Sequence, residues 1–195
     1  MNTPTHLILN AVLIEKWLGQ EGPTSRWLPI SAGALIPDLP MVVFYLYQRL
    51  ARGQSEKRIW SELYFEPSWQ ALFDAFNSFP LIAFAAWIAW RLKRTGWLLV
   101  FTSMALHSLF DFPVHREDAH AHFFPLTNWH FMSPVSYWDP EHFGFTLALA
   151  EIVVVLLGGA WLMRRSAAWM WVAAATLGAT ILFVGFVWIT WMPGS

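Results

Sequence analysis

The sequence predicts an all-α fold: one domain over residues 1–195 that forms a polytopic transmembrane bundle of about five to six helices. Three observations predict it. Hydrophobic residues make up 56% of the chain and charged residues only 13%, against about 25% in soluble domains. The apolar residues gather in blocks of about 20, the length a helix needs to cross a bilayer. The 14 tryptophans fit the aromatic belts that flank membrane spans.

The first expected element is an amphipathic helix over residues 4–18, which lies either inside the bundle or in the membrane interface. Thr3 is expected to cap it, with Pro4 at the first helical position. His6 lies on its polar face. Residues 1–15 contain no basic segment and no small-residue cleavage site, so we expect no cleaved signal peptide.

A polar turn over residues 19–25 leads into a second helix over residues 27–50. Pro37 and Pro40 interrupt this apolar run, and proline inside a helix removes a hydrogen-bond donor. We therefore expect a kink or a break there. Residues 51–69 are rich in charge and are expected to form a loop or a surface helix.

The next apolar segment, residues 70–90, is long enough to span a bilayer and carries Asp74 near its start. Another helix is expected over residues 96–112, and Pro113 ends it. The segment 114–143 that follows is polar, aromatic and rich in histidine, and is expected to be a loop.

Two further spans are expected over residues 144–163 and 167–192. The short turns at 19–26, 91–96 and 164–166 carry a small excess of Lys and Arg. By the positive-inside rule this places those turns in the cytoplasm and the histidine-rich loop on the other side. The expected location is the inner membrane of a bacterium.

Acidic residues occur where a bilayer makes them costly. Asp38, Asp74, Asp111 and Glu151 lie in or near expected spans, where a charge costs roughly 2.5–3.5 kcal/mol on insertion scales. The spans contain no Lys or Arg to pair with them. This favours either metal coordination or protonated, hydrogen-bonded acids.

His107 and Asp111 are four residues apart, so both project from one face of a helix and can clip a divalent ion. The alternative is a buried hydrogen-bonded pair without metal. The chain has no cysteine, so a metal must be held by nitrogen and oxygen ligands.

His107 and Asp111 are the first members of a concentrated group of polar residues. Four of the seven histidines lie within residues 107–122. The loop residues that can turn back toward the clip are His115, Asp118, His120 and His122. The alternative is that they are solvated loop residues. The aromatic run over residues 129–138 is expected to be an interfacial lid, or else to contact lipid.

Three short motifs follow in order: Thr5-His6, the GALIPD segment at 33–38, and the HSLFD segment at 107–111. Together they resemble the membrane-bound metal-dependent hydrolases of the YdjM/YbcI type, which are distantly similar to zinc-dependent phospholipase C. The resemblance covers residues 5–125.

The resemblance implies a helical bundle with a metal centre built from separate helices. Its implied ligands are His6, Asp38, His107 and Asp111, completed by His115 or by one of His120 and His122. The chain departs from the family where the family often has a histidine-bearing segment, and here has Asp74 and Asn77. Those two side chains are candidate oxygen ligands.

The expected function is therefore hydrolysis of a lipid or lipid-linked phosphoester or ester by a metal-activated water, with Zn²⁺ as the expected ion. Asp118 or Asp74 is the candidate general base, and Arg116 is the candidate phosphate-binding residue. The absence of cysteine and of a Gly-x-Ser-x-Gly segment disfavours a thiol or serine-elbow mechanism. The net charge of -1 indicates no nucleic-acid partner, and membrane lipids are the expected partners.

Two other functions remain open. The protein is a divalent-metal transporter or metal-sensing membrane protein if the polar residues form a path through the bilayer. It has a purely structural metal if the site is closed and fully coordinated. The last two expected spans contain few polar residues besides Glu151, which favours a site near one face of the membrane.

Overall fold

A computed structural model describes residues 1–19 and 26–191, with side chains described up to residue 182. All the regular secondary structure within these residues is helical, so the all-α prediction is confirmed. Most of the predicted turn at 19–25 and the predicted helix end at residue 192 lie outside the described residues.

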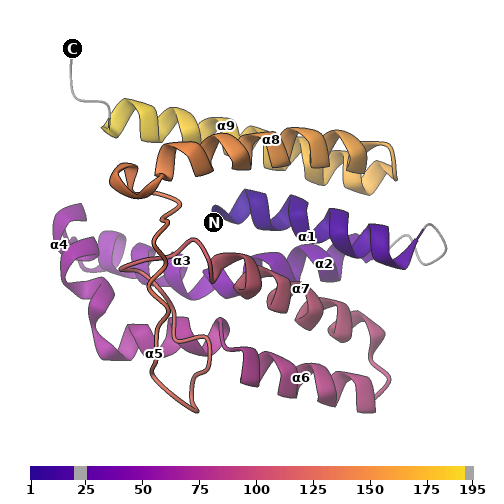
Figure 1. The fold of residues 1–195 in the computed structure, drawn as a ribbon, viewed down its shortest axis with the longest axis horizontal. Helices are drawn as coiled ribbons and strands as arrows, with labels where there is room; N and C mark the ends of the chain where they lie inside the picture. The colour runs from indigo at the N-terminus through magenta and orange to yellow at the C-terminus, as the bar shows by residue number, and fades with distance from the viewer. Residues whose placement is uncertain (20–25, 192–195) are drawn as a thin grey trace.

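The body of the molecule is a stack of helices that lie side by side (Figure 1). An outer layer of α8 and α9 covers α1, which in turn covers α2 and α7, and α6 packs on the far side of α7. The helices of the stack are α1 (Thr3–Leu18), α2 (Trp27–Leu35), α6 (Phe79–Arg91), α7 (Thr95–Asp111), α8 (Gly144–Met163) and α9 (Ala167–Trp191).

Helix α1 lies in the centre of the stack. Its side chains Ile8, Ala11 and Ile14 are almost fully buried and form a core cluster with α8 and α9. Of the two placements expected for this helix, the structure shows the one inside the bundle. It also begins one residue early, because Asn2 is the N-cap, and the Thr3 hydroxyl donates a hydrogen bond to Asp38 instead of capping.

Helices α2 and α7 approach so closely that only glycine fits at their contact. A Cβ atom on Gly33 would lie 2.1 Å from the backbone oxygen of Val100. The same contact is fixed by polar bonds, since the Ser103 hydroxyl donates to the carbonyl of Ile30 at 2.8 Å. The Asn10 amide of α1 donates to the Ser103 carbonyl at 2.8 Å, so three helices are joined at one level.

At the predicted proline kink the helix narrows into a short 3-10 turn and does not break. Chain 27–51 runs on as one helical segment, Trp27–Ala51, in which Pro37 lies in a 3-10 turn. Its parts are α2, the turn η2 (Ile36–Asp38), α3 (Leu39–Leu46) and the π-turn η3 (Tyr47–Ala51). The charged segment that follows contains α4 (Glu56–Ser61) and η4 (Leu63–Phe65), which confirms a surface helix there.

The segment predicted as a span over residues 70–90 is not one straight helix. This region forms α5 (Pro67–Phe76) and then α6, with a bend of 43° between them. The break has local causes: Ser78 caps α6 by accepting a hydrogen bond from the Leu81 amide, and Pro80 has no amide hydrogen to continue α5.

Two described helical segments, Trp27–Ala51 and α8, are long and apolar enough to cross a membrane, and the bent pair α5 and α6 adds a third if it acts as one span. The outer face of α8 exposes large apolar side chains such as Leu157, which is 69% exposed. Such faces are typical of helices that contact lipid.

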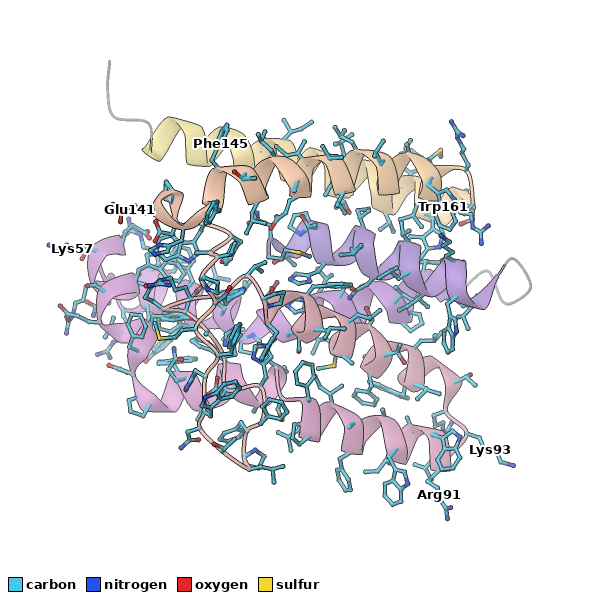
Figure 2. The ribbon with its side chains drawn as sticks, viewed as in Figure 1. Lys57, Arg91, Lys93, Glu141, Phe145 and Trp161 are labelled. Carbon is cyan, nitrogen blue, oxygen red and sulfur yellow. The ribbon has the colours of Figure 1, made fainter. Side chains whose placement is uncertain are left out.

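Two of the turns that carry Lys and Arg lie at one end of the stack. Figure 2 shows Arg91 and Lys93 at the same end as Trp161, and Lys57 and Glu141 at the opposite end. The guanidinium of Arg165 stacks over the Trp161 ring at 4.6 Å, so two of the three turns predicted to share a side do share an end.

Candidate metal centre

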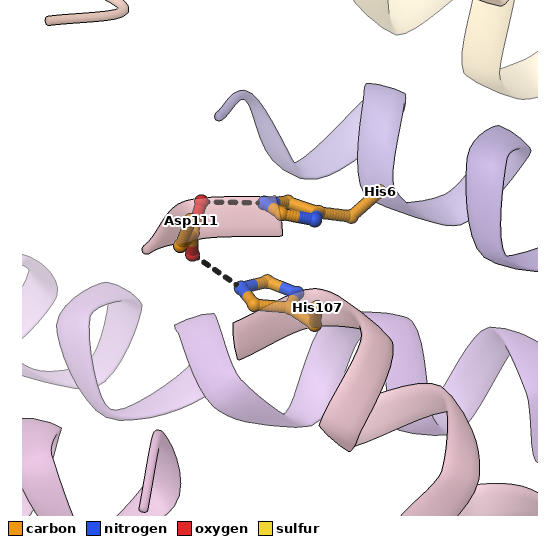
Figure 3. Close-up of side chains that lie close together, drawn as sticks. All are labelled: His6, His107 and Asp111. Atoms are coloured by element: carbon orange, nitrogen blue, oxygen red, sulfur yellow. Dashed lines mark hydrogen bonds and ion pairs between the residues drawn. The ribbon is translucent and has the colours of Figure 1, made fainter. Parts of the chain in front are cut away.

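Three buried side chains meet where the end of α7 approaches the start of α1 (Figure 3). The Nε2 atom of His6 lies 2.8 Å from Oδ1 of Asp111, and the Nε2 atom of His107 lies 3.0 Å from Oδ2 of the same carboxylate. The three ligand atoms lie within 4.8 Å of one another, a spacing at which they can hold one metal ion. None of the three side chains is more than 2% exposed.

The orientation of His107 is fixed from behind. Its Nδ1 atom lies 2.8 Å from the carbonyl oxygen of Ala34, which can only accept, so Nδ1 carries the hydrogen. The Nε2 atom is turned inward, is fully buried and faces the Asp111 carboxylate. A histidine held by a backbone carbonyl with its other nitrogen turned inward is the usual arrangement of a metal ligand.

Asp38 joins the group from a third segment. The 3-10 turn at Pro37 carries it to the end of α2, where Oδ1 lies 3.4 Å from Nε2 of His107. Its other oxygen accepts the Thr3 hydroxyl. The two distant residues predicted to meet the His107–Asp111 clip, His6 and Asp38, thus both reach it.

His115 reaches the same carboxylate from the loop after α7. Its Nε2 atom lies 3.2 Å from Oδ1 of Asp111, and the amino group of Met1 lies 2.5 Å from that oxygen. On its other side, His115 Nδ1 lies 3.0 Å from Oδ2 of Asp118, which also accepts from the Trp138 indole. Asp118 therefore lies behind His115, where it orients the ring.

The charge state of Asp118 follows from this contact. Burial disfavours the charged carboxylate, but the adjacent His115 ring outweighs it and lowers the pKa of Asp118 below its ordinary value. Asp118 is thus an anion at neutral pH and is already paired.

His120 and His122 are buried beside the centre and outside the three-residue group. The reading of these residues as solvated is wrong. The His120 ring centre lies 5.6 Å from that of His115, and His122 Nδ1 lies 2.9 Å from the His120 carbonyl. Burial lowers the pKa of His120 to about 3 and that of His122 to about 4, so both rings are neutral at pH 7.

A second polar group lies against an open cavity of about 710 Å³, which Asp74, Arg116 and His130 help to line. Asp74 accepts from the Ala121 amide at 2.8 Å, and its oxygens lie 3.9 Å from His120 Nδ1 and 4.0 Å from His130 Nε2. Because His120 contacts both His115 and Asp74, it links the buried centre to the cavity wall.

The structure adds contributors that residue patterns did not assign. They are the Ala34 carbonyl behind His107, the Thr3 hydroxyl on Asp38, and His130 at the cavity wall. The first has a signal in the sequence, because the last carbonyls of a helix have no partner within it and α2 ends before the proline turn. The other two depend on how distant segments meet.

A pH dependence of stability follows from His120 and His122. Their folded pKa values lie below the ordinary value of 6.5, so the unfolded chain takes up protons first as the pH falls. The stability they contribute is full above pH 6.5 and is lost as the pH falls from about 6.5 to about 4 for His122 and to about 3 for His120. The midpoint temperature of thermal unfolding of chelator-treated protein is expected to fall as the pH is lowered across this range. It is expected to fall less in the His120→Asn, His122→Asn double variant. An equal fall in both proteins would contradict this assignment.

Comparison of the chain with protein-family models, with curated proteins and with solved structures found no match.

Proposed function

We propose that the protein is a membrane-embedded, metal-dependent hydrolase that cleaves a lipid or lipid-linked phosphoester or ester with a metal-activated water. The observation that carries this proposal is the convergence of His6, Asp38, His107 and Asp111, from three separate segments, on one buried point. Histidine and carboxylate groups gathered away from water in this way are costly unless something compensates them. A divalent cation is the simplest compensation.

The proposed ion is Zn²⁺, because imidazole nitrogen with carboxylate oxygen and no sulfur is a donor set that zinc accepts. When bound, such an ion polarises a substrate oxygen and lowers the pKa of a water from 15.7 to about 7. The motifs that supply these donors occur in the order found in the YdjM/YbcI-type hydrolases they resemble, and we propose membership of that family on this basis.

The cavity wall supplies the remaining chemistry. Of the two candidate bases, Asp74 faces the cavity, whereas Asp118 is engaged by His115. Asp74 is therefore the candidate for the proton-accepting role, with His120 between it and the buried centre, and Asp118 positions His115. Arg116 lines the same cavity and is the group that binds a phosphate oxygen there, with Glu117 at 2.8 Å and the Ser133 carbonyl holding its guanidinium.

We propose that the stack crosses a bacterial inner membrane with about five to six helices. The end that carries Arg91, Lys93 and Arg165 then faces the cytoplasm, and the metal centre with its loop faces the other side. The concentration of polar side chains at one end supports an enzyme site over a path through the bilayer.

Turnover by the purified, metal-replete protein tests the proposal. Against bis(p-nitrophenyl) phosphate and a fluorescent phospholipid, we expect activity that a chelator abolishes. Asp74→Asn is expected to lower the rate about 100-fold or more, the range typical of a lost general base, with metal content unchanged. Glu66→Gln makes the same chemical change at an exposed position and is expected to be neutral.

Two results would contradict the proposal. A tightly held metal with no ester or phosphoester turnover, together with ion flux in liposomes, would indicate a transporter. Full activity in Asp74→Asn would show that Asp74 is not the proton acceptor.

A further inference from the structure

The loop between α7 and α8 has a tip, residues 123–132, whose composition is unusual for an exposed turn. The stretch 119–138 contains no Asp, Glu, Lys or Arg. The side chain of Leu126 is 77% exposed, and large apolar side chains around it, such as Trp129 and Met132, are more than half exposed. Loops in contact with water are normally polar, so this surface is made for a different environment.

Some of the backbone amides of the tip are paired within the loop. The amides of Leu126 and Thr127 donate to the Phe123 carbonyl, and the amide of Trp129 donates to the Thr127 hydroxyl. Pro125 has no amide hydrogen.

The tip is continuous with an apolar helix face. Its Phe123 ring contacts Phe79 at the start of α6, with ring centres 5.9 Å apart. Farther along α6, Phe84 and Trp87 stack on each other and are 59% and 53% exposed. The exposed apolar surface therefore runs from α6 onto the loop (Figure 1 shows the loop reaching the α5–α6 junction).

The other side of the same tip lines the cavity. Phe124, Asn128, His130 and Met132 contribute to its wall together with Asp74. The loop thus separates a cavity that holds the candidate catalytic groups from an outward surface of Leu, Phe and Trp.

We propose that the tip, residues 123–132, is seated in the interfacial layer of the lipid bilayer and holds the mouth of the cavity at the membrane surface. Tryptophan and phenylalanine next to short polar residues are the side chains favoured in that layer. It follows that the substrate is a membrane-resident amphiphile, whose apolar chains stay in the bilayer while its head group reaches Asp74 and Arg116. The placement of the tip rests on the membrane placement in the proposed function, and the inference about the substrate rests on the proposed hydrolase as well.

The absence of cysteine allows a direct test, since a single introduced thiol is the only site of labelling. Leu126→Cys is spin-labelled and reconstituted in vesicles of phosphatidylcholine and phosphatidylglycerol. Collision of the label with apolar oxygen and with a water-soluble nickel chelate is then measured. Leu157→Cys on the exposed face of α8 is the lipid reference, and Lys57→Cys, on exposed α4, is the water reference.

We expect the oxygen-to-nickel ratio at Leu126→Cys to shift away from the Lys57→Cys value and toward the Leu157→Cys value. A ratio equal to that of Lys57→Cys, with Leu157→Cys in lipid, would overturn the placement of the tip and leave the proposed hydrolase standing. Dipolar broadening between labels, with both probes excluded, would overturn it in favour of a contact between two copies of the chain. Water-like ratios at all three positions would overturn the membrane placement on which both proposals rest.

Discussion

His107→Ala and Asp111→Ala are each expected to abolish the divalent metal content of the purified protein. Asp111 contacts His6 through one oxygen and His107 through the other, so its loss leaves two imidazoles without the carboxylate between them. His107 supplies a buried Nε2 atom that faces the Asp111 carboxylate at 3.0 Å, so its loss removes the other half of the pair. Elemental analysis of protein purified in detergent measures this directly.

The matched control is His142→Ala. This histidine belongs to the same loop region as His115, but it pairs with Asp139 at 2.6 Å and lies outside the cluster. Its removal is expected to leave the metal content unchanged. Asp111→Asn keeps the shape of the side chain and removes its charge, so it separates loss of a ligand from loss of the fold. If metal content is unchanged in His107→Ala and in both Asp111 variants, the centre does not bind metal.

Gly33→Ala is expected to produce the largest loss of stability among conservative substitutions in the stack. The added Cβ would lie 2.1 Å from the Val100 oxygen and 2.7 Å from Ser103 Cβ. Since a backbone oxygen cannot rotate away, α2 and α7 must separate. Overpacking of a core costs about 1–3 kcal/mol, and here it also strains the hydrogen bond from Ser103 to Ile30.

The same shift weakens the metal centre, because the carbonyl of Ala34, next to Gly33, fixes the His107 ring. We therefore expect Gly33→Ala to lower both the thermal unfolding midpoint and the metal affinity. Gly96→Ala, on α7, meets no atom within 4 Å and is expected to be neutral or slightly stabilising. Equal midpoints for the two variants would show that the α2–α7 contact yields more easily than its geometry indicates.

Local pattern was enough to predict most of the helices and one side of the candidate metal centre. The four-residue spacing of His107 and Asp111 fixes their shared face in any helix, and α7 realises it. The bend between α5 and α6 was missed because hydropathy rates 70–90 as one apolar run. The hydroxyl cap of Ser78 and the fixed ring of Pro80 decide the backbone there.

Other features of the candidate site depend on how distant segments pack, which the sequence pattern does not reveal. Spacing alone gives no reason for His6 to lie 2.8 Å from Asp111, which is 105 residues later, and only the resemblance pointed to their meeting. The burial of His120 and His122 could not be predicted from the sequence either, since a buried polar loop has the same composition as a solvent-exposed one. Their environment comes from the packing of the loop over α6 and α7, with His122 between Phe79 and Phe112.

The central claim is that α1 and α7 share one metal ion through His6, His107 and Asp111. X-ray absorption at the metal edge, recorded on the wild type and on His6→Ala, tests it most directly. We expect imidazole nitrogen and carboxylate oxygen at about 2.0–2.2 Å, as for zinc, and one imidazole fewer in the variant. Identical spectra from the two proteins, or a purified wild type that neither contains nor takes up a divalent metal, would contradict the account.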